Sequence, residues 1–330
     1  DLSKRLMLMI DGHLSTHQHS VDSGRSVRVR AGGYWGFAAS PSADLATLET
    51  NARRNAAAMS HFGPRATAPL PGGAYQGAHR FAGRPELSPE HCSDQLAALQ
   101  AHCRQRYPDV LSTRLMLLQE QHLKHVSNSL GADAHSAIQR TALVLALLAK
   151  DERGTPIEVS LPLSCKGSAA DLEFSVAALD ERIDALHTHL QAKRHAVAPR
   201  GGEHTLVLGP ALAGILAHEA MGHPCEADIV LGGASTADLL GQRVASDLVT
   251  MVDFAHHAQG QETLIPVYAD DEGTPAQDAV LIERGMLRTC MSSRETAQVL
   301  GCAPTGNARA YAPGDEPLVR MRNTAILPGS

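Results

Sequence analysis

One apolar stripe constrains the fold of this chain more than any other feature of its sequence. Over residues 169–193 the apolar residues recur at alternating steps of four and three, which predicts a single long helix with one buried face. Such a helix must pack against a layer of other elements. The run Pro199-Arg200-Gly201-Gly202 then interrupts the pattern, so we place a domain boundary there, between residues 1–199 and residues 200–330.

The residues before this boundary predict an α/β domain with a mixed or antiparallel sheet and long helices. One further helix is expected over 45–59 with Ser42 as its cap, and another from Ser88-Pro89, since serine caps helices and proline suits their first position. A Pro/Gly-rich connection at 63–87 separates the two. Strands are expected at 6–10, 27–30, 34–38, 111–118, 122–126 and 137–148.

Residues 200–330 predict a β-rich domain that carries a functional helix. A buried strand at 205–208 is expected to precede a helix that begins near Ala211. Beyond residue 264, strands with Gly/Pro turns should surround one more helix near 294–300. The predicted fold class is therefore α+β.

Charge, apolar runs and cysteine usage exclude several classes of function. The net charge is −6 and no block of Lys or Arg occurs, which argues against nucleic acid as a partner. The longest apolar run, 141–149, falls far short of the ~20 residues that a membrane helix needs. The six cysteines form no CxxC pair, and no signal peptide opens the chain, so we expect a reducing, cytoplasmic compartment.

Residues 216–228 carry the pattern that most strongly indicates chemistry. His218, Glu219 and His223 form an HExxxH array. Neutral imidazole is the usual nitrogen ligand of zinc, and a carboxylate beside the first ligand can deprotonate a water whose pKa zinc lowers to about 7. The array therefore predicts a zinc site with Glu219 as the catalytic base. The same spacing also arises by chance, and a lone histidine in a helix is often a core residue.

The spacing of the two histidines poses a geometric problem that their neighbours can solve. On an ideal helix, residues four apart lie about 40° apart around the axis, whereas residues five apart lie about 140° apart. Gly222 tolerates unusual backbone angles, and Pro224 disfavours a helical conformation at the preceding residue. We expect the helix to distort at Gly222, which would turn His223 back toward the first ligand.

The array and its surroundings resemble the TldD/PmbA family of metallopeptidases. TldD-type subunits carry HEAxGH followed by x-x-E-x-D, which here reads His218 to His223, then Glu226 and Asp228. The PmbA/TldE-like subunits lack the array, so the chain is identified as a TldD-like, metal-bearing subunit. Further stretches that match the family in order are 27–38, 207–210, 270–275, 281–287, 304–309, 320–324 and 327–329.

The resemblance implies a zinc-dependent metallopeptidase that acts on extended or unfolded peptides, in peptide maturation or degradation. It implies a cytoplasmic dimer, formed with a second copy or with a PmbA/TldE-like subunit. Relatives also include dedicated hydrolases of natural-product pathways. A different class of function, a metal-poor scaffold subunit that completes a partner's active-site cavity, stays open as an alternative.

The third zinc ligand is the point at which the sequence departs from the family. In the family this ligand is a cysteine in the C-terminal part, and none of the six cysteines here lies in a matching context. We therefore expect a chain that is incomplete at its C-terminus and holds zinc poorly. Glu226 and Asp228 are expected to orient the ligands, or else one of them replaces the missing ligand. Cys225 is expected to be a small buried residue.

Four further residues are assigned to the substrate cleft. The sequence Asp270-Asp271-Glu272 followed by Gly-Thr-Pro predicts a turn that lines this cleft. The residues assigned to it are Asp271, Thr274, Thr305 and Asn307.

Overall fold

A long, curved sheet forms the frame of the molecule. The structure, a computed structural model, describes residues 1–81 and 83–329. The strand order is β2-β1-β6-β7, and the outer edge of β7 pairs with β5 in parallel and, further along, with β8 in antiparallel fashion. The predicted mixed sheet is therefore confirmed. Its strands are β1 (Leu2–Ile10), β2 (His13–Asp22), β5 (Gln76–Arg80), β6 (Ser112–Ser127), β7 (Asp133–Lys150) and β8 (Pro156–Lys166).

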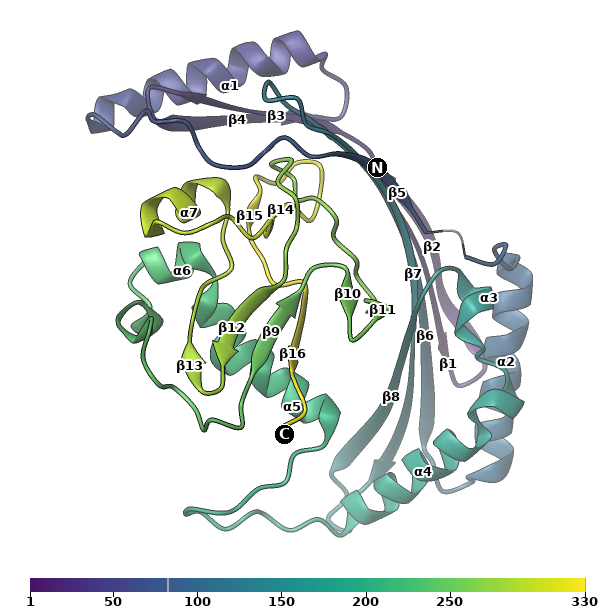
Figure 1. Cartoon of the computed structure of the whole chain (residues 1–330). Coiled ribbons are helices and arrows are strands. Elements are labelled where there is room, and N and C mark those ends of the chain that lie inside the picture. The colour runs from purple at the N-terminus through teal and green to yellow at the C-terminus, as the bar shows by residue number, and fades with distance from the viewer. Residues whose placement is uncertain (82, 330) are drawn as a thin grey trace.

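Three helices cover the convex face of this sheet, α2 (Pro89–Arg106), α3 (Ala169–Leu172) and α4 (Val176–Arg194) (Figure 1). The predicted stripe of α4 is buried against the leucines of β6 and β7. The prediction of a single helix over 169–193 is wrong in one respect. Glu173 adopts a left-handed conformation (φ 51°) and separates α3 from α4. Among the described residues, no helix is long and apolar enough to cross a membrane.

A separate arm consists of a hairpin and one helix, β3 (Arg25–Ala31), β4 (Tyr34–Ser40) and α1 (Leu45–Met59) (Figure 1). The predicted helix over 45–59 is confirmed, but its cap is Asp44 and not Ser42. The Asp44 carboxylate accepts the N–H of Thr47 at 2.7 Å. The helix packs so closely on the hairpin that a Cβ at Gly36 would collide with the backbone oxygen of Ala52.

Several strands differ from those expected because their partners lie far along the chain. The segments 111–118 and 122–126 form one continuous strand, β6, and β5 and β8 were not predicted. The strand expected at 205–208 is absent: these residues lie in a loop, and no described strand pairs with them. Leu206 and Val207 are 75% and 98% exposed.

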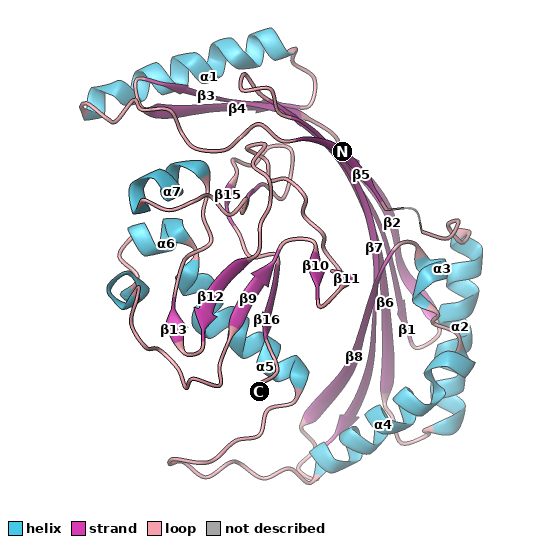
Figure 2. Cartoon of the chain, viewed as in Figure 1, coloured by secondary structure: helices cyan, strands magenta, loops and turns pink. Residues whose placement is uncertain are grey.

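Residues 201–329 lie on the concave side of the sheet (Figure 1), and their centre is a small antiparallel sheet of order β13-β12-β9-β16. Helices and short strands surround it (Figure 2), which confirms the α+β class. The boundary predicted at 199/200 falls in the loop between α4 and α5. The elements of this part are α5 (Pro210–Leu216), α6 (Ala227–Leu231), α7 (Arg294–Leu300), β9 (Met251–Phe254), β10 (His257–Ala258), β11 (Gln261–Glu262), β12 (Ala279–Glu283), β13 (Met286–Leu287), β14 (Ala308–Arg309), β15 (Leu318–Val319), β16 (Asn323–Ile326) and the short 3₁₀ turn η4 (Ser235–Leu239). Another 3₁₀ turn, η1 (Ser60–Phe62), follows α1 in the arm.

A fully buried ion pair fixes the segment that leads into β16. The guanidinium of Arg322 donates to the carboxylate of Asp253 in β9 at 2.8 Å. The same carboxylate accepts the backbone N–H groups of Arg322 and Asn323. Because a buried charge is tolerated only when it is paired and hydrogen-bonded, this network holds the start of β16 in one position beside α5.

Candidate metal centre

The HExxxH array lies on a helix that changes type at its first histidine. After α5, residues Ala217–Gly222 form a π-helical turn, η2, and His223–Cys225 form a 3₁₀ turn, η3. The backbone N–H of His223 donates to the carbonyl of His218, five residues back. In a π-turn this longer hydrogen bond widens the helix, so residues five apart come to lie on the same side. The two histidines of the array therefore share one face.

The structure corrects the physical cause that the sequence suggested for this distortion. Gly222 and His223 both have ordinary right-handed helical angles, with φ of −61° and −57°, so no unusual backbone occurs at the glycine. The widened turn itself brings the histidines together. Gly222 serves close packing instead, because a Cβ there would collide with Sδ of Met321. Pro224 lies at the start of η3, where a missing N–H costs little.

Replacing Gly222 by alanine should destabilise the π-turn. The added methyl group would meet the thioether of Met321 and, at 3.2 Å, the carbonyl oxygen of Ala217. Because Met321 is packed in the core and its thioether must shift there, we expect the cost of overpacking, about 1–3 kcal/mol. The free energy of unfolding, measured by denaturant titration, should fall by that amount. Gly214→Ala in α5 is the matched control. No other atom lies within 4 Å of the Cβ that alanine would add there, so the free energy of unfolding should stay the same or rise slightly through helix propensity. Equal effects of the two substitutions would contradict the packing argument.

The side chains of the array form a compact donor set. One possible ligand atom each from His218, Glu219 and His223 lies within 4.8 Å of the others. The two imidazole rings are 4.6 Å apart between centroids and inclined at 76°. Two imidazoles and a carboxylate are ligand types that zinc accepts, so the residues present fit the metal that the sequence predicts.

Glu226 lies directly behind this donor set. Its Oε1 is 3.4 Å from Nδ1 of His223, which leaves Nε2 of that ring free to act as a ligand. The carboxylate is largely buried, and burial raises the pKa of Glu226. A carboxylate on the far nitrogen of a ligating histidine fixes the orientation of the ring. The geometry thus favours the orienting role expected for Glu226.

Asp228 and Cys225 do not join the array. The carboxylate of Asp228 accepts the backbone N–H of Val319 at 3.3 Å and so links α6 to β15. Cys225 is fully buried, and burial raises the pKa of its thiol to about 12. The expectation of a small buried residue at this position is confirmed. A role for Asp228 or Glu226 as third ligand stays a prediction.

A cavity of about 390 Å³ opens beside the array. One wall consists of small and apolar residues of α5, and the other is formed by the segment that the Asp253–Arg322 pair holds in place. The sequence suggested this second wall only through the family-like stretch 320–324. The lining residues besides His218 and Glu219 are Ala211, Gly214, Ile215, Met321, Arg322 and Thr324.

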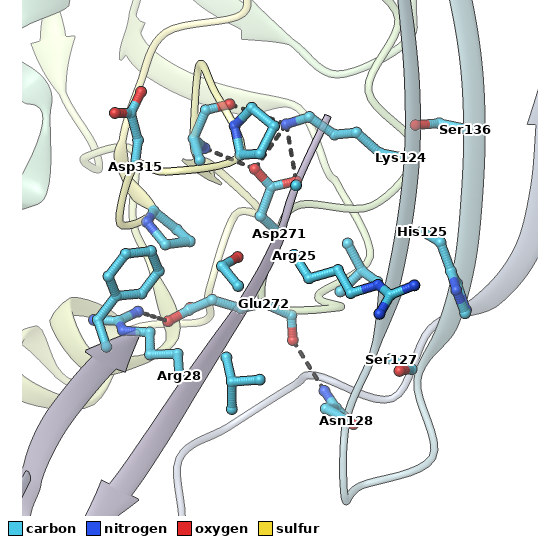
Figure 3. Close-up of a pocket in the computed structure, with 18 of the residues that line it drawn as sticks. Arg25, Arg28, Lys124, His125, Ser127, Asn128, Ser136, Asp271, Glu272 and Asp315 are labelled. Carbon is cyan, nitrogen blue, oxygen red and sulfur yellow. Dashed lines mark hydrogen bonds and ion pairs between the residues drawn. The ribbon is translucent and has the colours of Figure 1, made fainter. Parts of the chain in front are cut away.

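Asp271 faces a second, larger cavity of about 1390 Å³ between the arm, the end of the curved sheet and residues 271–317. The predicted turn is confirmed, since Asp270 accepts the N–H groups of Glu272 and Thr274. Figure 3 shows the ammonium of Lys124 reaching Asp271, at 2.8 Å, and Glu272 beside Arg28. Sequence patterns gave no sign of the Lys124–Asp271 pair, because β6 and this turn meet only in the folded chain.

Thr274, Thr305 and Asn307 line neither of these cavities. Asn307 is fully buried, donates to Asp253 at 2.9 Å and accepts from the hydroxyl of Thr305. Thr274 is also buried, and its backbone N–H closes the turn at Asp270. Thr305 and Asn307 thus hold loops in place around the buried ion pair, whereas Thr274 belongs to the turn at Asp270. Contact with substrate stays a prediction for them.

Comparisons with known proteins identify relatives of this chain. Residues 201–330 match the family model described as the PmbA/TldA metallopeptidase C-terminal domain. A protein named Metalloprotease from Methanothermobacter thermautotrophicus is 31% identical over 342 aligned positions, which cover 98% of this chain and 69% of that relative. The Zinc metalloprotease TldD homolog of Saccharolobus solfataricus is 35% identical over 156 positions, 47% of this chain and 34% of the relative.

A solved structure shows the same fold. The crystal structure of TldE from Thermococcus kodakarensis superposes with a TM-score of 0.75 over all of this chain and 74% of that chain, at 20% sequence identity. The family model and the relative that matches over nearly the whole sequence show that the chain belongs to the PmbA/TldD family of metallopeptidases.

Proposed function

We propose that this chain is the metal-bearing subunit of a zinc metallopeptidase that hydrolyses extended or unfolded peptides in maturation or degradation. One observation carries the proposal: the π-turn η2 places His218, Glu219 and His223 on one face, beside an open cavity. The names of the curated relatives support a metalloprotease and, for one of them, zinc.

Each residue of the array has a distinct role in this proposal. His218 and His223 would hold zinc, which when bound supplies a Lewis acid for the scissile carbonyl and lowers the pKa of water. Glu219 would take the proton of the attacking water and pass it to the leaving amine. Glu226 would keep the ring of His223 in its orientation through Nδ1.

The apolar wall of α5 supports a peptide as the substrate. Ala211, Gly214 and Ile215 offer an uncharged surface next to the base, against which a peptide backbone and small side chains can lie. Opposite them, Met321, Arg322 and Thr324 line the cavity along the start of β16, where the guanidinium of Arg322 is buried against Asp253. A site with an apolar wall and few polar groups is typical of substrate pockets.

We further propose a cytoplasmic enzyme that works as a dimer, with a second copy or with a PmbA/TldE-like subunit. The fold shared with TldE is consistent with such an assembly, and all six cysteines are free, as expected in a reducing compartment.

Removal of metal from the full-length protein tests the proposed function. Hydrolysis of an unstructured peptide should be lost after treatment with a zinc chelator and restored by added Zn²⁺, but not by Mg²⁺, which prefers oxygen ligands. The rate is followed by chromatography of the cleaved peptide. A metal-poor scaffold subunit would show no hydrolysis before or after zinc is added. Hydrolysis that persists in the metal-free protein would contradict a zinc-dependent reaction.

A further inference from the structure

A second group of possible metal ligands lies on the curved sheet, away from the HExxxH array. The antiparallel register pairs His125 of β6 directly with His135 of β7. Asp133 precedes His135 by two residues, and side chains two apart on a strand point to the same face. Three possible ligands therefore project from one patch near the tip of the β6–β7 hairpin. The two cavities beside this patch and beside the array share no lining residue.

The three side chains converge on a common point. Oδ1 of Asp133 lies 2.9 Å from Nε2 of His125 and 3.2 Å from Nε2 of His135. The two rings stack almost in parallel, with centroids 4.0 Å apart and planes 7° apart, so both present the same nitrogen to the same side. One possible ligand atom from each residue lies within 4.8 Å of the others.

These separations are those of ligands around one ion. Bonds of about 2.0–2.1 Å at a tetrahedral angle put two zinc ligands about 3.3 Å apart. The observed N–O distances of 2.9 and 3.2 Å are close to this value. Because imidazole binds a metal in the plane of its ring, at least one of the two stacked rings must rotate to reach the ion, and both side chains are exposed enough to do so.

The cluster is accessible and has no other structural task among the described residues. The side chains of His125, Asp133 and His135 are 53%, 62% and 53% exposed, and their only polar partners in the described chain are one another. The hairpin is held by its backbone ladder and by Asn128, which donates to Gly73 and Glu272. Both histidines line the larger cavity, in which Figure 3 labels His125.

We propose that His125, Asp133 and His135 form a second zinc site. Three protein ligands leave one of the four positions around the ion open. A zinc ion here would also tie β6 to β7 close to the hairpin tip that contacts the turn at Glu272. This site is independent of the proposed catalytic centre and would exist whether or not the array binds metal.

The test isolates the second site by removing the first. Full-length protein without a histidine tag and with both His218→Ala and His223→Ala is titrated with Zn²⁺ in a calorimeter. One equivalent should bind, and His125→Ala, His135→Ala or Asp133→Asn added to this background should each weaken binding at least tenfold. His17→Ala, on the exposed edge strand β2, is the matched control and should leave binding unchanged. No binding in the background protein, or binding that all three substitutions leave intact, would overturn the proposal.

Discussion

Replacing either His218 or His223 by alanine should remove zinc from the HExxxH array. A catalytic zinc is held by three protein ligands, and the π-turn supplies two of them from one face. Loss of one histidine leaves too few ligands in the array, so the ion should escape during dialysis. In the full-length protein we expect zinc bound at the array to fall from about one equivalent to under a tenth, because too few ligands remain to hold the ion.

To measure the zinc bound at the array alone, the second proposed zinc site must first be disabled. Full-length protein carrying His125→Ala provides it, and elemental analysis after dialysis then reports the array alone. His17→Ala in the same background controls for the loss of an exposed imidazole. A full equivalent of zinc retained without His218 or without His223 would refute the ligand assignment, whatever the protein hydrolyses.

The part of the site that lies close together in sequence could be predicted from the sequence. The spacing of the array showed that an ideal helix separates the histidines, and therefore that the helix must be distorted. The kind of distortion could not be read from the same residues. It depends on Gly222 fitting against Met321, a contact between segments far apart in the chain. Gly222 was singled out for backbone freedom, and that reason is wrong: its angles are those of an ordinary helix, and its advantage is the space left by the missing side chain.

Elements stabilised by distant partners were the ones that sequence patterns missed. β6 continues through Gln119 and Glu120, which are buried polar residues that break the apolar pattern. Glu120 is tolerated there because Lys4 and Arg140 of the neighbouring strands pair with it. At 205–208 the opposite holds: the apolar pattern is present, but no described strand lies beside it. Local periodicity reports burial only where a partner exists.

The register of the β6–β7 hairpin could not be read from the sequence. A turn confined to Asn128–Gly131 would place His125 opposite Ala134, whereas the folded hairpin pairs Ser127 with Asp133 and His125 with His135. Such a one-residue difference moves every side chain of a strand to the other face. Neither the second proposed zinc site nor the partners of Asp271 could therefore be inferred from the sequence.

Replacing Glu219 by glutamine should abolish hydrolysis and leave zinc in place. Glutamine has nearly the same size and helix propensity, so the π-turn should persist, but its amide cannot accept the proton of the attacking water. General-base catalysis typically contributes about 10²–10⁴-fold, and we expect the turnover number to fall by at least that factor. Zinc content should match that of the unchanged protein because His218 and His223 remain.

Glu203→Gln, in the exposed loop before α5, is the matched control and should keep both activity and metal. Near-normal turnover in the Glu219 variant would show that another group activates the water, whereas loss of zinc would make Glu219 a ligand and not the base.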